Sequence, residues 1–275
     1  MKLCGHTMGT PEKDIYQAIS FFAELGLEGI EVRCADNGHI NPETISDAEV
    51  ERIAAHAREQ GVAVACLTPY YRDFMTEEAT RATLAGYRRT FEVARGLGCG
   101  LVRAISGTWP QQGHERCEVF ERALAGMQRA GDLAAEHGLR LAVETHSGQL
   151  TFSAAEAAEF IEALDHPAVG VLWDHYWTYV ADGIGVAAAL ELIGPRIIHV
   201  HAKNVRYDDE GGRQTTLLDD GELDWCEVVA GLAGIGYDGY ISDEYEKYWK
   251  PELPEPEVGM RRNAEVLRDC LSRLR

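Results

Sequence analysis

Long apolar runs are missing from this 275-residue sequence: none approaches the roughly 18 residues that a membrane-spanning helix needs. The first residues, MKLCGHTMGTPEKD, also lack the hydrophobic core of a signal peptide. We therefore expect a cytoplasmic protein with no membrane contact.

Basic residues are scarce as well. Lys and Arg total 26 against 45 Asp and Glu, which gives a formal net charge of −19. Proteins bind nucleic acid largely by neutralising its phosphates with Lys and Arg, and anionic membranes attract the same side chains. Nucleic acid is therefore not expected as a partner. A small neutral substrate is compatible with this charge, whereas an anionic one requires a local basic pocket.

The sequence has no CxxC pair, and its cysteine count is odd. From this we expect buried, reduced thiols in a reducing compartment, in preference to a cysteine nucleophile or a zinc cluster. The seven cysteines are Cys4, Cys34, Cys66, Cys99, Cys117, Cys226 and Cys270.

Eight short β-like runs alternate with segments of helical periodicity. The runs lie at 2–6, 28–33, 62–67, 99–105, 139–144, 168–174, 196–202 and 238–244. This alternation predicts a single (β/α)8 TIM-barrel domain over residues 1–275. A doubly wound open sheet is the alternative, but no GxGxxG motif follows the first run. The longest stretch expected to be irregular is 203–225, and the amphipathic C-terminal segment is expected to form the last covering helix.

The last four predicted strands each end in polar residues that share one face. LRLAVETHSG carries Glu144, VGVLWDHYW carries Asp174, RIIHVHAKN carries His201, and DGYISDEYE carries Glu244. Residues at alternate positions of a barrel strand point inward, and active sites form at the C-terminal strand ends. The sequence therefore predicts that these four side chains meet at the barrel mouth, with His199 deeper in the barrel as a hydrogen-bonded core residue.

Three buried carboxylates could not all remain ionised without a counter-ion. A divalent cation bound by Glu144, Asp174, His201 and Glu244 resolves the repulsion. Oxygen-rich ligation with one nitrogen favours Mn²⁺, with Mg²⁺, Co²⁺ or Zn²⁺ as alternatives. The sequence thus predicts one divalent cation as cofactor.

Six motifs give the chain a resemblance to a known group. They are GLEGIEV, LAVETHSG, LWDHYW, HVHAKN, DDGELDW and GYDGYISDEYE. With these the chain resembles the xylose-isomerase-like TIM-barrel superfamily, specifically its sugar phosphate isomerase/epimerase branch. The resemblance implies the same ligands, Glu144, Asp174, His201 and Glu244, and gives the two glutamates the role of proton shuttles. Lys203 matches the lysine of the family's HxHxKD pattern.

The chain departs from that pattern in two places. Asn204 replaces the Asp of HxHxKD, and Tyr176 and Trp177 stand where family members usually carry a histidine that contacts the substrate. The second change affects the expected substrate contact, and it motivates one alternative, a sugar-binding barrel without turnover.

We therefore expect a metal-dependent isomerase or epimerase of carbohydrate metabolism that acts on a sugar or sugar-like polyol. Glu144 and Glu244 would move a proton next to a carbonyl through a metal-stabilised enediolate. The candidate substrate-binding residues are His146, Lys203, His6, Glu31, Trp109, Trp177 and Glu246. Tyr70 is a further candidate for the pocket wall, and Glu31 has the alternative of an ion pair with Arg33.

Other functions remain open at this point. A dehydratase or lyase acting on an inosose-like keto-polyol would use the same metal and enolate, and the two differ in product mass. An abasic-site endonuclease resembles this barrel but is opposed by the net charge. A non-phosphorylated ligand is favoured, because the basic residues of the 203–225 segment lie among acidic ones. The C-terminal helix is compatible with a homodimer or homotetramer.

Overall fold

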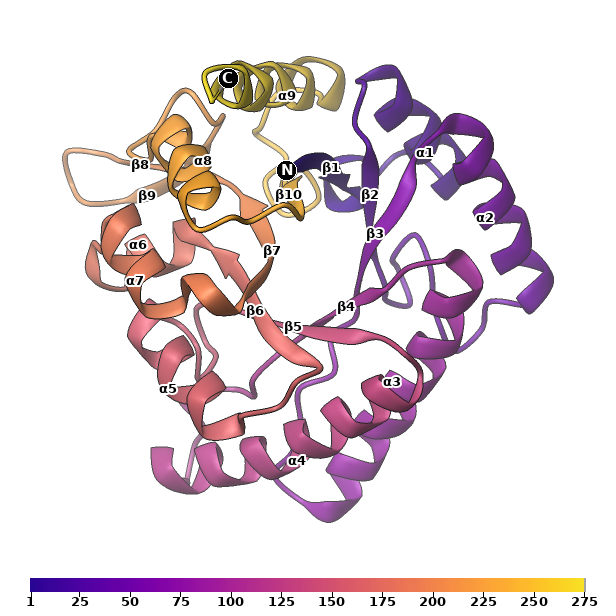
Figure 1. Ribbon diagram of the computed structural model, residues 1–275, viewed down its shortest axis with the longest axis vertical. Helices are drawn as coiled ribbons and strands as arrows, with labels where there is room; N and C mark the ends of the chain where they lie inside the picture. Colours follow the sequence, from indigo (N-terminus) through magenta and orange to yellow (C-terminus); the bar gives the residue numbers. More distant parts are fainter. Residues whose placement is uncertain (275) are drawn as a thin grey trace.

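Eight parallel strands close into a barrel in the computed structural model, which describes residues 1–274 (Figure 1). Around the barrel the strands follow the order β1-β10-β7-β6-β5-β4-β3-β2. Their bounds are β1 Lys2–His6, β2 Gly29–Arg33, β3 Ala63–Thr68, β4 Leu101–Ala104, β5 Arg140–Glu144, β6 Val169–Asp174, β7 Ile197–Ala202 and β10 Tyr240–Asp243. Each predicted run overlaps one of these strands, so the expected (β/α)8 barrel is confirmed.

Helices surround the barrel, as Figure 1 shows. Those that cover it are α1 Ile15–Glu24, α2 Asp47–Gln60, α3 Glu77–Leu97, α4 Arg116–Glu136, α5 Ala154–Leu164, α7 Val186–Ile193, α8 Trp225–Gly234 and α9 Pro256–Ser272. The hydrophobic core lies between helices and strands, because outward strand residues such as Val143 and Val200 are apolar and at most 1% exposed. Among residues 1–274, no helix is both long and apolar enough to cross a membrane.

Local sequence signals set the ends of several helices. Ser153 and Glu156 form a capping box at the start of α5, in which each side chain accepts a hydrogen bond from the other residue's backbone N–H. Gly61 and Gly98 end α2 and α3 with φ of 70° and 72°, a conformation that glycine adopts without steric cost. The two helices therefore end at these glycines, and the chain continues into β3 and β4.

The segment between β7 and α8 is not irregular, contrary to the expectation from the sequence. It forms an antiparallel hairpin of β8 Asn204–Tyr207 and β9 Arg213–Thr216, which projects from the barrel in Figure 1. Asn204 anchors the base of this hairpin, since its side-chain amide donates to the carbonyls of Leu218 and Leu223 at 2.7 and 2.9 Å. The prediction missed the hairpin because its second strand, RQTT, contains no apolar residue and so shows no alternation of apolar and polar residues.

Two further helical features shape the barrel mouth. Helix α6, His175–Asp182, follows β6 directly and places Tyr176 and Trp177 in its first turn. Helix α9 packs against β1 and β10, which confirms it as the last covering layer. Its Asn263 donates to Asp243 Oδ1 at 2.9 Å and so ties α9 to the end of β10.

The expectation of seven reduced cysteines was wrong for two of them. Cys226 on α8 and Cys270 on α9 form a disulfide, across a sequence separation of 44 residues. The sequence did not reveal the pair because neither spacing nor periodicity shows which residues of two packed helices face each other. The other five cysteines are free: Cys4, Cys34, Cys66 and Cys99 are buried, and Cys117 is exposed.

Candidate metal centre

Three carboxylates and one imidazole meet at the C-terminal ends of four consecutive strands of the barrel. Glu144 and Asp174 are the last residues of β5 and β6, His201 lies near the end of β7, and Glu244 directly follows β10. In the barrel register, Asp174 pairs with His201, and His201 pairs with Ser242, two residues before Glu244. All four side chains are at most 3% exposed. The structure therefore brings together the four residues that the sequence predicted would converge.

The donor atoms of this cluster point at one another. One donor atom from each residue lies within 4.8 Å of the other three. His201 Nδ1 is 3.2 Å from both Glu144 Oε1 and Glu244 Oε2. Glu144 Oε1, Asp174 Oδ1 and His201 Nδ1 have no hydrogen-bond partner among residues 1–274, whereas Asp174 Oδ2 and Glu244 Oε2 face the ammonium of Lys203. Buried and converging ligand atoms of this chemistry fit one divalent cation.

Two buried cations of the chain itself also touch these carboxylates. Lys203 Nζ lies 2.8 Å from Asp174 Oδ2 and 2.6 Å from Glu244 Oε2. On the other side of the cluster, Arg103 Nη1 donates to Glu144 Oε2 at 3.0 Å. The Lys203 and Arg103 side chains are only 2% and 6% exposed, so solvent screens these ion pairs little.

The acidities of the carboxyl groups follow from burial and from these neighbours. Burial raises the pKa of Asp174 to about 7, although the Lys203 ammonium opposes that shift. Burial alone would also raise the pKa of Glu144, but the Arg103 guanidinium and then the His201 imidazole lower it to about 2. The pKa of Glu244 is also held well below its usual value, because His201 and Lys203 outweigh the effect of burial. The two glutamates therefore stay ionised at neutral pH.

Glu31 lies beneath the cluster, paired with two histidines. Its Oε1 is 3.0 Å from His201 Nε2 and its Oε2 is 2.9 Å from His199 Nε2. The alternative of an ion pair between Glu31 and Arg33 is wrong, since the guanidinium of Arg33 donates to Tyr70 and to Asn37. His199 has the core hydrogen bond that the sequence predicted for it.

Aromatic rings border the cluster on the side of α6. The ring of His146 lies 4.5 Å from that of Trp177, measured between centroids. Lys203 Nζ is 5.2 Å from the centroid of Tyr176 and 5.3 Å from that of Trp177. Arg213 of the hairpin covers the same two rings from outside. Tyr176 and Trp177 thus pack around Lys203.

The remaining predicted site residues lie at different depths. Glu246 is 3.4 Å from Lys203 Nζ, at the edge of the cluster. His6 is fully buried; its Nδ1 accepts from the Met8 N–H, and its ring centroid is 5.9 Å from that of His201. Trp109 is half-buried and packs against the hydrophobic core.

Arg103 is the residue near the centre that sequence reasoning missed. It is an inward-facing arginine within the apolar strand β4, LVRA, and is 5% exposed. A charged residue inside such a strand is itself a signal, because Arg is almost never fully buried without a partner. Its guanidinium also lies 4.6 Å from the ring centroid of Tyr70, another of the predicted wall residues.

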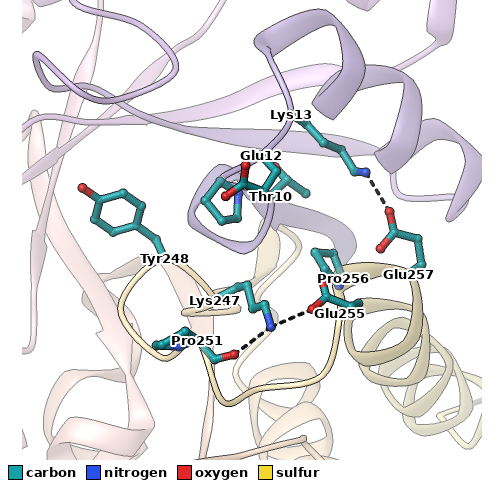
Figure 2. Close-up of a pocket in the computed structure, with 10 residues that line it drawn as sticks. Thr10, Glu12, Lys13, Lys247, Tyr248, Pro251, Glu255, Pro256 and Glu257 are labelled. Atoms are coloured by element: carbon teal, nitrogen blue, oxygen red, sulfur yellow. Dashed lines mark hydrogen bonds and ion pairs between the residues drawn. The ribbon is translucent and has the colours of Figure 1, made fainter.

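A surface cavity of about 660 Å³ lies apart from this cluster (Figure 2). It lies between the loop after β1 and the loop after β10, and none of the four clustered residues lines it. Figure 2 shows its two lysines directed at acidic partners: Lys13 contacts Glu257 at 2.7 Å, and Lys247 contacts Glu255 at 3.1 Å. With both cations paired, the cavity offers no set of reactive groups comparable to the buried cluster.

Comparison with known proteins agrees with this architecture. The family described as "Xylose isomerase-like TIM barrel" matches residues 19–270. The inosose dehydratase of Bacillus velezensis is 31% identical over 148 residues, which cover 49% of this chain and 49% of that protein. The chain therefore matches about half the length of this curated relative.

Solved structures match over almost the whole chain. A probable 3-DHS dehydratase from Bacillus anthracis has a TM-score of 0.81 at 18% identity, covering 98% of this chain and 99% of that one. D-Psicose 3-epimerase from Clostridium cellulolyticum H10 has a TM-score of 0.77 at 18% identity, covering 99% and 97%. At these identities the two structures establish the fold alone.

Proposed function

This chain belongs to the xylose isomerase-like TIM-barrel family, and from that premise we propose that it is a divalent-metal-dependent isomerase or epimerase of a sugar or sugar-like polyol. One observation carries the proposal: two buried glutamates from β5 and from the end of β10 approach the same His201 nitrogen at 3.2 Å. Strands β5 and β10 lie on either side of β7 in the barrel, so the two carboxylates flank one position.

Glu144, Asp174, His201 and Glu244 are the residues that would hold the metal. We favour Mn²⁺, with Mg²⁺, Co²⁺ and Zn²⁺ as alternatives, because three of the four donors are carboxylates. A divalent cation bound there would supply Lewis-acid polarisation of a substrate carbonyl and of the hydroxyl next to it.

The chain's own groups would move the proton. The carbon next to the carbonyl would lie between Glu144 and Glu244, so that one carboxylate removes a proton and the other returns it. Arg103 donates to Glu144 Oε2 and so would fix the orientation of this carboxylate beside the substrate. On the other side of the cluster, Lys203 would hold Glu244 in place through its contact with Oε2.

Other residues would enclose the ligand. Trp177 and His146 offer adjacent ring surfaces for the C–H faces of a sugar, and Glu246 lies within reach of the same ammonium as the ligands. We propose a non-phosphorylated ligand, because the nearby basic groups are already engaged: Lys203 contacts three carboxylates and Arg206 pairs with Asp220.

The test is hydrogen exchange with the solvent. The protein is loaded with Mn²⁺ and incubated with a panel of ketoses in D₂O. We expect a product of unchanged composition that gains deuterium at the carbon next to the carbonyl. Glu144→Gln and Glu244→Gln should each lower kcat by about 10²- to 10⁴-fold. Glu92→Gln on the exposed side of α3 is the matched control and should retain activity. Full turnover in both site variants would exclude the two-glutamate mechanism.

A dehydratase acting on an inosose-like keto-polyol is the second candidate. It is supported by the 31% identity to an inosose dehydratase and by the buried ammonium of Lys203, a group able to donate a hydrogen bond to a leaving hydroxyl. The same incubation separates the two reactions, because dehydration lowers the product mass by one water. A barrel that only binds sugar would instead show ligand-dependent thermal stabilisation without deuterium uptake or loss of water.

A further inference from the structure

We infer that Glu31 is a positioning residue, which fixes the tautomer and the orientation of His201 so that Nδ1 faces the metal. The inference rests on the proposed metal-dependent function. It concerns a side chain that would contact neither the metal nor the substrate, and that sequence analysis had considered for binding a substrate hydroxyl.

The contact spans the inside of the barrel. Glu31 lies on β2 and His201 on β7, and these strands are not neighbours in the sheet. Glu31 Oε1 is 3.0 Å from His201 Nε2, and both side chains are fully buried. Because both side chains are buried, bulk solvent screens the interaction between them little.

The position of one proton follows from this geometry. A His201 that binds a metal is neutral, and because a carboxylate only accepts hydrogen bonds, its single proton would lie on Nε2 beside Glu31. Nδ1 then carries the lone pair, and it is this atom that lies 3.2 Å from both Glu144 and Glu244. A carboxylate behind a metal-binding imidazole orients the ring and raises its basicity as a ligand.

His199 explains why a carboxylate suits this position. Its Nε2 lies 2.9 Å from the second oxygen of Glu31, so two N–H donors converge on one residue and need two acceptor atoms. The other ring nitrogen, His199 Nδ1, has no hydrogen-bond partner among the described residues, so the contact with Glu31 is the hydrogen bond that this ring makes there. We therefore assign His199 to anchoring Glu31.

A second cation deeper in the barrel is the competing interpretation. Donor atoms of Cys4, Glu31 and His199 also lie within 4.8 Å of one another. Both oxygens of Glu31 are already satisfied by the histidines, however, so a second ion would have to break the contacts that orient His201. The two interpretations predict different metal stoichiometries, one ion per chain against two.

The experiment measures metal binding rather than turnover. Co²⁺ is titrated into metal-free protein, and affinity, stoichiometry and the visible absorption band are recorded. We expect one Co²⁺ per chain in the wild type. Glu31→Leu should weaken binding by about 10- to 100-fold and shift the band, because His201 is then free to turn. Glu31→Gln should lose less Co²⁺ affinity. Its side-chain carbonyl can still accept a hydrogen bond from His201, and its side-chain amide can donate one to His199 in the other tautomer.

A buried variant that does not touch the histidines controls for general loosening of the barrel. Leu67→Ala on β3 removes a fully buried side chain from the outer core and should lower stability while leaving Co²⁺ affinity unchanged. In the Zn²⁺ form, imidazole ¹⁵N spectra should place the His201 proton on Nε2. Glu31→Gln is close in shape to the native residue and keeps the test available if Glu31→Leu does not fold.

Three results would overturn the inference. They are wild-type affinity in both Glu31 variants, a His201 proton on Nδ1, and two ions per chain with one lost in Cys4→Ser. Absence of any metal uptake by the wild type would instead overturn the proposed function, and the inference with it. If the wild type binds Co²⁺ and both Glu31 variants bind it equally well, only the positioning role of Glu31 is wrong, and the proposed function stands.

Discussion

At the scale of single residues, the candidate metal centre already contains a cation, the ammonium group of Lys203. It lies within 2.8 Å of two of the expected ligands, Asp174 and Glu244, and its side chain is 2% exposed. The carboxylates hold its pKa well above the ordinary value, although burial opposes this. Without a metal, Lys203, Arg103 and His201 are therefore the groups that keep Glu144 and Glu244 ionised.

We predict that Lys203→Met raises divalent-metal affinity by at least about tenfold. A fixed ammonium repels a dication a few ångströms away by several kcal/mol at the effective dielectric of protein interiors, and methionine removes that repulsion. The metal-free variant should be less stable, by roughly 3–5 kcal/mol, because the acids lose their partner. Calorimetric titration and urea unfolding measure the two effects.

Lys247→Met is the matched control for Lys203→Met. Lys247 is also mostly buried, at 13% side-chain exposure, but its ion pair is with Glu255, away from the ligands. Its replacement should leave metal affinity unchanged. Weaker metal binding in Lys203→Met than in the wild type would contradict the competition that the geometry indicates.

His6 predicts a loss of stability in acid. Burial lowers its pKa from 6.5 to about 4, against the opposing effect of Glu31 and Glu244. The unfolded chain therefore takes up the proton first. Stability is fully present above about pH 6.5 and falls as the pH drops toward about 4, by up to roughly 3 kcal/mol from this residue.

His6→Asn should flatten this pH dependence, because asparagine does not titrate and can still accept the Met8 N–H that His6 Nδ1 accepts. The measurement is urea unfolding of metal-free wild type and variant across this pH range. Comparing the two proteins isolates His6 from other buried histidines. Parallel stability curves for the two proteins would show that His6 does not carry the effect.

At the scale of secondary-structure elements, the disulfide ties the last two helices together. Cys226 of α8 and Cys270 of α9 close a loop with a sequence separation of 44 residues. We predict that reduction, or Cys226→Ser, lowers the free energy of unfolding by about 2–4 kcal/mol, because the unfolded chain regains the freedom that the link removes. Cys117→Ser, at an exposed free cysteine, should change little. Detection of seven free thiols in the denatured, unreduced protein would exclude the link.

The same scale shows what the sequence could and could not predict. Strands β5 to β7 were recognisable because an apolar run with polar residues at its end is a local feature of the sequence. The two-residue period of a strand then predicted that Glu144, Asp174 and His201 would converge. The partners of Glu31 were not predictable. They depend on barrel closure, which sets β2 opposite β7 across 168 and 170 residues of sequence. The roles of all these residues in catalysis stay predictions.

At the scale of the whole molecule, an excess of acidic charge surrounds a buried cluster that is itself acidic. The net charge of −19 creates a field that attracts cations, and the cluster offers a cation four converging donors. Net charge alone predicted no nucleic-acid partner, but it could not locate Lys203 and Arg103. Their positive charges within an acidic protein emerge only when the barrel brings distant strands together.

Metal binding should therefore stabilise the entire barrel. A ligand that binds only the folded state at 100 times its Kd adds about 2.7 kcal/mol. For a chain of this size that corresponds to a rise in Tm of roughly 5–10 °C. We expect Mn²⁺ to produce this shift in metal-free protein and EDTA to reverse it. Asp174→Asn removes one ligand charge and should lose most of the shift, whereas Glu92→Gln on the outer surface should retain it. If Mn²⁺, Mg²⁺, Co²⁺ and Zn²⁺ all leave the Tm of the wild type unchanged, the converging carboxylates are stabilised by Lys203 and Arg103 alone, and the metal-dependent reaction is excluded.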